Sequence, residues 1–151
     1  MNRSLSIAFT LLVGGVVAAS SQSNVVIDLL LNENQATYGK TLYLTVLAGG
    51  LIPEVSSVKQ ALHVAQDEHW VVRDKEVDDQ VTEAEFCYMV MKALRLKGGI
   101  LYTLFPSPRY AFREMKFRKL ISEAKSPGDV VSGVHVVQTL GEVLEWRAQN
   151  Q

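Results

Sequence analysis

Residues 79–86, with the sequence DQVTEAEF, predict the start of a helix. The rest of the chain can be divided into helical units by comparison with this segment. Thr82 precedes Glu85 by three positions, the spacing of a capping box, in which the hydroxyl accepts from the Glu85 amide and the carboxylate reaches back to the Thr82 amide. An apolar stripe at helical spacing follows, formed by Phe86, Val90, Ala93 and Leu94. We therefore expect a helix that begins at Thr82 and ends at residues 98–99, where two glycines permit a left-handed backbone.

A second amphipathic helix is predicted upstream of this one. It is marked by two capping serines and by apolar residues at helical spacing, namely Ser56, Ser57, Val58, Ala61, Leu62 and Ala65. The polar residues 73–79 separate the two helices and are typical of a loop. Residues 58–98 are therefore expected to form one helix–loop–helix unit.

The same pattern recurs fifty positions further along the chain. Residues 59–94 align with residues 109–144 without a gap, the polar loop matches as well, and Ser132 takes the capping place of Thr82. A shorter copy precedes both. Because each helix pair leaves an apolar face that it cannot bury alone, we expect the pairs to pack on one another. The prediction is an all-α fold of three helix–loop–helix repeats, at about residues 24–50, 58–98 and 109–147.

The first residues predict export. Arg3 is followed by an apolar run at residues 7–17 and by small residues at 17–21, which is the pattern of a signal peptide with its cleavage zone. We therefore expect a signal peptide at residues 1–21, a mature domain at residues 22–151, and a location in the periplasm or on the cell surface. The later sequence has no apolar stretch of the ~20 residues that a spanning helix needs, so no transmembrane span is expected after cleavage.

The composition narrows the classes of partner. The chain has 15 Lys and Arg against 16 Asp and Glu, and no basic block stands out, which argues against a nucleic-acid partner. Its single cysteine, Cys87, cannot form an intramolecular disulfide, and its apolar surroundings predict an inert buried thiol.

The sequence offers little for metal binding or catalysis. The acidic residues of the loop at 74–79 lack the spacing and the glycine of an EF-hand, and His63, His69 and His135 lack metal-ligand spacing. Neither a nucleophile elbow nor a phosphate-binding loop occurs. We therefore expect a protein that is not an enzyme and that needs no metal or other cofactor.

The opening segment DQVTEAEF also resembles the signature of the S-layer homology (SLH) domain, which is usually written around Thr-Arg-Ala-Glu. Residues 129–137, DVVSGVHVV, look like a degenerate copy, and the extended form with residues 96–114 looks similar to SLH-like exported proteins of spirochaetes. The resemblance implies a bundle of three helix pairs with pseudo-threefold symmetry. It also implies a role in holding proteins to the cell wall.

The sequence departs from that family at the ligand position. In the family the signature arginine helps to bind an anionic polymer, whereas this chain has Glu83 there and Gly133 in the next copy. A carboxylate cannot pair with a negatively charged sugar. The capping residues Thr82 and Glu85 are retained, so the resemblance implies a retained architecture with lost or altered polymer binding.

Residues 98–114, GGILYTLFPSPRYAFRE, allow two interpretations. As a connector, Pro106 and Pro108 would hold the chain extended while apolar side chains pack across the joint between repeats; these are Ile100, Leu101, Leu104 and Phe105. As a ligand groove, flat aromatic faces would contact sugar rings and two arginines would bind an anionic substituent; these are Tyr102, Phe105, Tyr110, Arg109 and Arg113.

Two functions follow from these observations. The first is a cell-envelope module that binds cell-wall polysaccharide or peptidoglycan through the groove between repeats. The second is a degenerate scaffold or adaptor that binds other envelope proteins and has no glycan site. Glu83 favours the second, because it replaces the ligand arginine.

Overall fold

The computed structural model describes residues 20–70 and 75–150, and every regular element in these ranges is a helix, so the all-α prediction is confirmed. The predicted signal peptide lies outside the described residues except for its last two positions, which begin the first helix. No helix of the described ranges combines the length and the hydropathy needed to cross a bilayer. The helices are α1 (Ser20–Leu31), α2 (Tyr38–Ala48), α3 (Val58–Asp67), α4 (Glu83–Ala93), α5 (Ile100–Leu104), α6 (Pro108–Phe117) and α7 (Gly133–Asn150).

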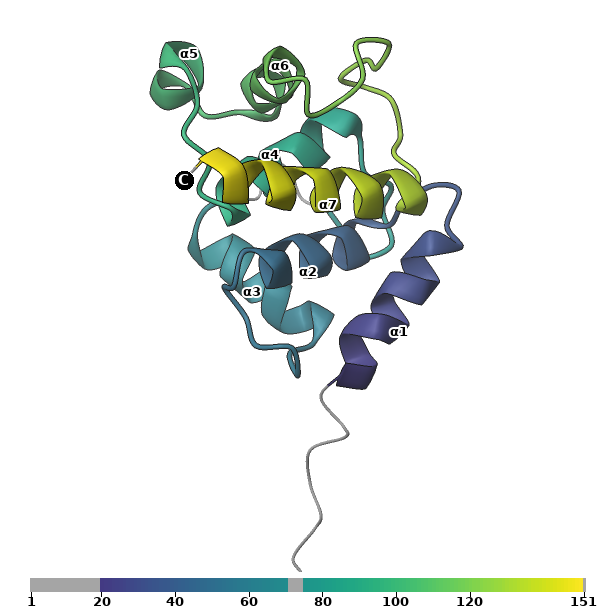
Figure 1. Ribbon diagram of the computed structural model, residues 1–151. Helices are drawn as coiled ribbons and strands as arrows, with labels where there is room; N and C mark the ends of the chain where they lie inside the picture. The colour runs from purple at the N-terminus through teal and green to yellow at the C-terminus, as the bar shows by residue number, and fades with distance from the viewer. Residues whose placement is uncertain (1–19, 71–74, 151) are drawn as a thin grey trace, which may run out of the picture.

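Helix α4 forms the centre of the molecule. Nine of its eleven residues are buried, because α2 and α6 pack against it from different sides (Figure 1). A helix that is apolar all round belongs in a core, and the sequence EAEFCYMVMKA of α4 fits that rule after its first turn. Helices α3 and α6 instead bury one face each, through Ala61 and Ala65 in α3 and through Ala111, Phe112 and Met115 in α6.

The segments that precede α2, α4 and α7 meet and close a ring of backbone hydrogen bonds. The amide of Ala36 donates to the carbonyl of Val131 at 2.7 Å, that of Val81 to Ala36 at 3.1 Å, and that of Val131 to Val81 at 3.0 Å. All three side chains are fully buried. Segments far apart in the chain are therefore tied together at the starts of three helices.

The fifty-residue spacing of the sequence reappears in the geometry. Helices α3 and α6 begin at Val58 and Pro108, and helices α4 and α7 begin at Glu83 and Gly133. The intervening loops contain the same turn, in which the amide of residue 76 donates to the carboxylate of Asp79 at 2.9 Å and that of residue 126 to Asp129 at 2.8 Å. The loop that aligns in sequence thus has matching hydrogen bonds in both places.

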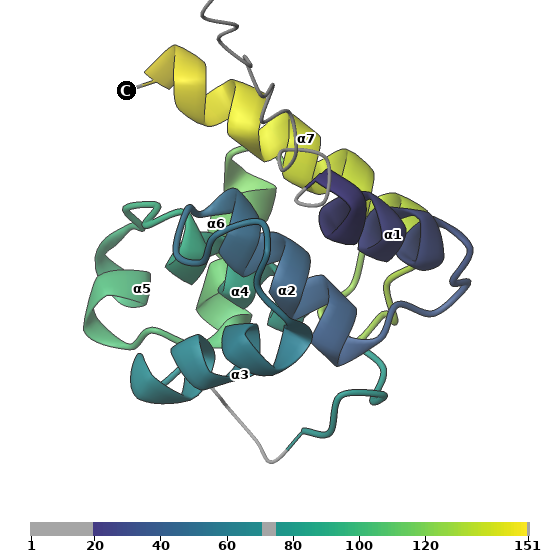
Figure 2. The same cartoon turned by 90° about the horizontal axis from the view of Figure 1, so that it is seen from below.

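Helix α1 completes the packing at the other end of the chain. It contacts both α2 and α7, and the view from below shows α1 lying beside α7 (Figure 2). The contact is close, because a Cβ atom at Gly133 would collide with the backbone carbonyl of Leu30. The absence of a side chain at Gly133 therefore allows α7 to pack closely against α1.

Three helices end with a left-handed residue that is not glycine: His69 at φ 55°, Arg95 at φ 52° and Lys119 at φ 58°. In each case the next amide donates back across the last turn, as from Leu96 to the carbonyl of Met91 at 2.9 Å. The prediction that residues 98–99 end the helix that begins after Thr82 is wrong. Helix α4 ends earlier because burial of Leu96 stabilises the turn at Arg95.

The predicted extended connector contains a short helix, α5, and its apolar side chains do not pack across a joint. Ile100 is 78% exposed, Leu101 46%, Leu104 63% and Phe105 62%. Only Tyr102 of this helix is buried. The connector interpretation is therefore wrong for these four side chains, because α5 lies beside α6 at the edge of the molecule and leaves them uncovered (Figure 1).

Candidate functional site

The predicted groove residues divide between two separate hollows. Arg109 lines a hollow of about 570 Å³, whereas Arg113 and Tyr110 line another of about 280 Å³. The two arginines that we expected to act together therefore face different spaces. We call these spaces the Arg109 hollow and the Arg113 hollow.

The Arg109 hollow lies where the N-termini of α4 and α6 meet the loop before α7. Its lining comes from the three segments Thr82, Ala84 and Glu85; Ser107, Pro108 and Arg109; and Pro127. Arg109 is exposed and forms no ion pair with a described carboxylate. A hollow of this size is within the range of small-ligand sites.

The predicted capping box forms one wall of the Arg109 hollow. The Glu85 carboxylate accepts from the amide and from the hydroxyl of Thr82, both at 2.9 Å, and lies 3.3 Å from the ammonium of Lys75. Ser132 also acts as predicted, since its hydroxyl accepts from the amide of His135 at 3.2 Å. Because the Glu85 charge is balanced by Lys75, Arg109 supplies the uncompensated charge at this hollow.

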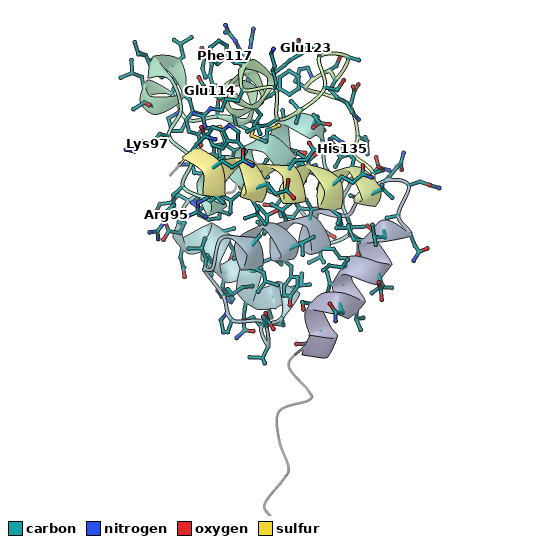
Figure 3. All side chains as sticks on the ribbon, viewed as in Figure 1. Arg95, Lys97, Glu114, Phe117, Glu123 and His135 are labelled. Carbon is teal, nitrogen blue, oxygen red and sulfur yellow. The ribbon has the colours of Figure 1, made fainter. Side chains whose placement is uncertain are left out.

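The Arg113 hollow lies between α5 and α6 and is lined by Ile100, Leu101, Tyr110, Arg113, Glu114 and Phe117. Phe117 is 85% exposed. Figure 3 shows Phe117 and Glu114 near each other at the α5–α6 end of the molecule. Glu114 is already engaged, since Arg118 lies 3.9 Å from its carboxylate.

Tyr102 and Phe105 also differ in their surroundings. Tyr102 is 7% exposed and points inward, while Phe105 is largely exposed at the end of α5. Burial, with smaller contributions from Tyr88 and Glu114, raises the pKa of the Tyr102 phenol well above its usual value. Its hydroxyl has no hydrogen-bond partner among the described residues, so Tyr102 acts as an apolar anchor that holds α5 on the core.

Glu83 lies in the interior rather than on a ligand-facing surface. It is fully buried, and its Oε1 lies 2.8 Å from Nε2 of His135. Its second oxygen lies 3.7 Å from the ammonium of Lys125 and has no hydrogen bond. The ring of His135 also meets that of Phe86 edge-on at 6.2 Å. The Glu83 carboxylate therefore joins α4 to α7 and to the loop before it.

Sequence reasoning missed the part played by His135. From the sequence we weighed His135 only as a metal ligand, and its spacing from the other histidines argued against that role. The fifty-residue alignment offered a signal, because it pairs His135 with Glu85 and Lys125 with Lys75. By analogy with Lys75 and Glu85, whose side chains lie 3.3 Å apart, Lys125 and His135 are expected near each other, but only the structure shows that both reach Glu83.

The composition also concealed an uneven distribution of charge. Residues 92–119 contain eight of the 15 basic residues and one of the 16 acidic residues, Glu114. The apparent balance of the whole chain arises because acidic residues predominate elsewhere. The segment from the end of α4 to the end of α6 is therefore strongly basic.

Two other features bear on chemistry in the described part of the chain, the arrangement of possible metal ligands and the environment of Cys87. No group of three or more His, Cys, Asp and Glu residues there is arranged to hold a metal ion. Cys87 is fully buried, and burial, together with the nearby Glu83 charge, raises the pKa of its thiol well above the usual value. A buried thiol that resists ionisation is unreactive, as the apolar sequence around it suggested.

Comparison with protein-family models, with curated proteins and with solved structures found no match. The described part of the chain is therefore characterised by its own geometry: it is all-helical, with the Arg109 hollow, the Arg113 hollow, a buried Glu83–His135 contact and a basic segment at residues 92–119.

Proposed function

We propose that the chain is an SLH-like domain, in which three helix–loop–helix units pack with pseudo-threefold symmetry. The units would be α1 with α2, α3 with α4, and α6 with α7. The ring of amides at Ala36, Val81 and Val131 supports this arrangement, because each segment donates to one neighbour and accepts from the other. The shared fifty-residue spacing of helices and turns supports it for the second and third units.

The proposed function is non-enzymatic binding in the cell envelope, to peptidoglycan or a cell-wall polysaccharide, by an exported protein. The Arg109 hollow carries this proposal. It lies between the second and third proposed units, has room for a sugar residue, and offers one guanidinium without an ionic partner in the described residues. A guanidinium binds carboxylate or phosphate substituents through paired hydrogen bonds.

The test is retention of the purified protein on isolated sacculi, with peptidoglycan-associated polymers left in place. Arg109→Ala is expected to abolish most of the retention. Lys59→Ala is the matched control, because Lys59 is also exposed and stands fifty positions earlier, at the second residue of α3. If Arg109→Ala and Lys59→Ala are retained equally, the Arg109 hollow is not the glycan site.

A second function, that of a scaffold or adaptor for envelope proteins, is favoured by Glu83. Its carboxylate occupies the family's ligand position and is used internally by His135 and Lys125. The sacculus assay separates the two functions, since an adaptor without a glycan site would show no retention even as wild type.

A further inference from the structure

We propose that the surface formed by α5 and the adjoining face of α6 docks on an anionic phospholipid bilayer. We call it the α5–α6 surface, and define it by the apolar residues Ile100, Leu101, Leu104, Phe105 and Phe117 and by the exposed basic residues Lys97, Arg113 and Lys119. The inference is independent of the glycan proposal, which rests on the Arg109 hollow.

The first observation is the concentration of exposed apolar side chains. Phe117 is 85% exposed, Ile100 78%, Leu104 63% and Phe105 62%. Ile100, Leu101 and Phe117 line the same hollow, so apolar groups of α5 and α6 are neighbours rather than scattered. Contiguous exposed apolar patches on soluble proteins mark sites of interaction with other proteins or with membranes.

The second observation is the charge around this patch. Lys97, Arg113 and Lys119 are exposed and form no ion pair with a described carboxylate. The one acidic residue of the region, Glu114, lies beside Arg118. Figure 3 shows Lys97 at the side of the molecule that also carries Phe117 and Glu114. Arg113 thus lies in the same hollow as three of the exposed apolar residues, and Lys97 stands three positions before α5.

The third observation is the way in which α5 is held. Tyr102 is buried and fixes the helix on the core, so the remaining apolar residues of α5 are held in outward positions. Gly98 permits this anchoring, because a Cβ atom there would collide with the Tyr102 ring. The backbone at Lys97 is held against the end of α6, because its carbonyl accepts a hydrogen bond from the guanidinium of Arg118. The surface is built on α6 and the core and is not a loose loop.

These features favour a lipid surface over a protein partner. Interfacial helices combine bulky apolar residues that enter the acyl boundary with Lys and Arg that bind lipid phosphates. The α5 helix lies at the periphery of the molecule, where a flat bilayer can reach it (Figure 1). Protein interfaces are depleted in lysine, whereas two of the three exposed cations of this surface, Lys97 and Lys119, are lysines.

The experiment is sedimentation of the full chain with vesicles of phosphatidylcholine, either alone or containing phosphatidylglycerol. We expect binding to be much stronger to the vesicles that contain phosphatidylglycerol and to weaken as salt is added. Lys97→Gln with Arg113→Gln should weaken the phosphatidylglycerol-dependent binding by roughly fivefold for each removed cation. Leu104→Ser with Phe105→Ser should weaken it by about tenfold or more.

The matched control changes the same kinds of side chain elsewhere. Val55→Ser with Lys59→Gln removes an exposed apolar group and an exposed cation near the start of α3, and should leave binding unchanged. All variants keep residues 1–19, so any lipid affinity of that segment is common to them.

A second measurement reports on the surface itself. Thr103→Cys places a thiol on exposed α5, where an environment-sensitive dye can be attached, while buried Cys87 is not labelled. Vesicles containing phosphatidylglycerol should shift the emission of this dye to the blue, and a dye at Val55→Cys should not respond.

The proposal is overturned if the dye on α5 responds no more than the dye at residue 55. It is also overturned if the α5–α6 variants bind vesicles as wild type does. Concentration-dependent self-association that Leu104→Ser with Phe105→Ser abolishes, without vesicle binding, would assign the surface to a protein contact instead. Retention on sacculi by the same variant would be unaffected, so this proposal and the glycan proposal fail separately.

Discussion

At the scale of single residues, the contact between Glu83 and His135 has the largest consequence. A buried carboxylate is costly unless it is paired, and Oε1 of Glu83 finds His135 at 2.8 Å while Lys125 stays at 3.7 Å. The position of Glu83 at the first turn of α4 adds a favourable interaction with the helix N-terminus. Glu83 therefore has a structural role, because its contact with His135 joins α4 to α7.

Removal of His135 should therefore destabilise the fold. We expect His135→Ala to lower the free energy of unfolding by about 2 kcal/mol, because the buried Glu83 carboxylate loses the ring nitrogen that contacts it most closely. Urea denaturation followed by circular dichroism measures this. His63→Ala removes an exposed histidine from α3 and should change the stability by less than about 0.5 kcal/mol. Equal stability of the two variants would exclude a structural role for the pair.

At the scale of elements, the helix starts were predictable and the helix ends were not. A capping box is local, so Thr82 and Glu85 announce the start of α4 within four residues. The ends depend on whether the residue after a left-handed position finds the core, as Trp70, Leu96 and Leu120 do. Local periodicity predicts neither the burial of these three residues nor the exposure of α5. Both depend on which other helices cover the segment in the folded protein.

The left-handed residue at the end of α6 gives a direct test of this explanation. Lys119 has a φ of 58°, which costs an L-residue more than it costs glycine. We expect Lys119→Gly to raise the free energy of unfolding by about 1 kcal/mol. Lys119→Ala keeps the strain and serves as the control. If both variants melt at the same temperature, the left-handed turn is not strained.

At the scale of the whole molecule, the described helices form one packing unit whose closure depends on the approach of α7 to α1. Gly133 lies at a close point of that approach, and its amide also donates to the carbonyl of Glu33 at 2.9 Å. The sequence predicted an all-helical fold whose apolar faces pack on one another, because those faces recur at helical spacing along the chain. It could not predict that Gly133 is a spacing residue, because that depends on where Leu30 lies.

A pair of identical substitutions in α7 tests this closure. Gly133→Ala should lower the free energy of unfolding by about 2 kcal/mol or more, since the new methyl group would meet the backbone of Leu30. Gly141→Ala, at an open and exposed position of the same helix, should raise it by about 0.5–1 kcal/mol. A smaller effect at Gly133 than at Gly141 would show that α7 does not approach α1 so closely.

The most direct measurement is native-state hydrogen exchange at the amides of Ala36, Val81 and Val131. If these three segments close a ring that joins the helix pairs, all three amides should exchange only through openings whose free energy approaches that of global unfolding. Rapid exchange of any one of them through local opening, while the helix cores stay protected, would contradict the closure of the three pairs into one unit.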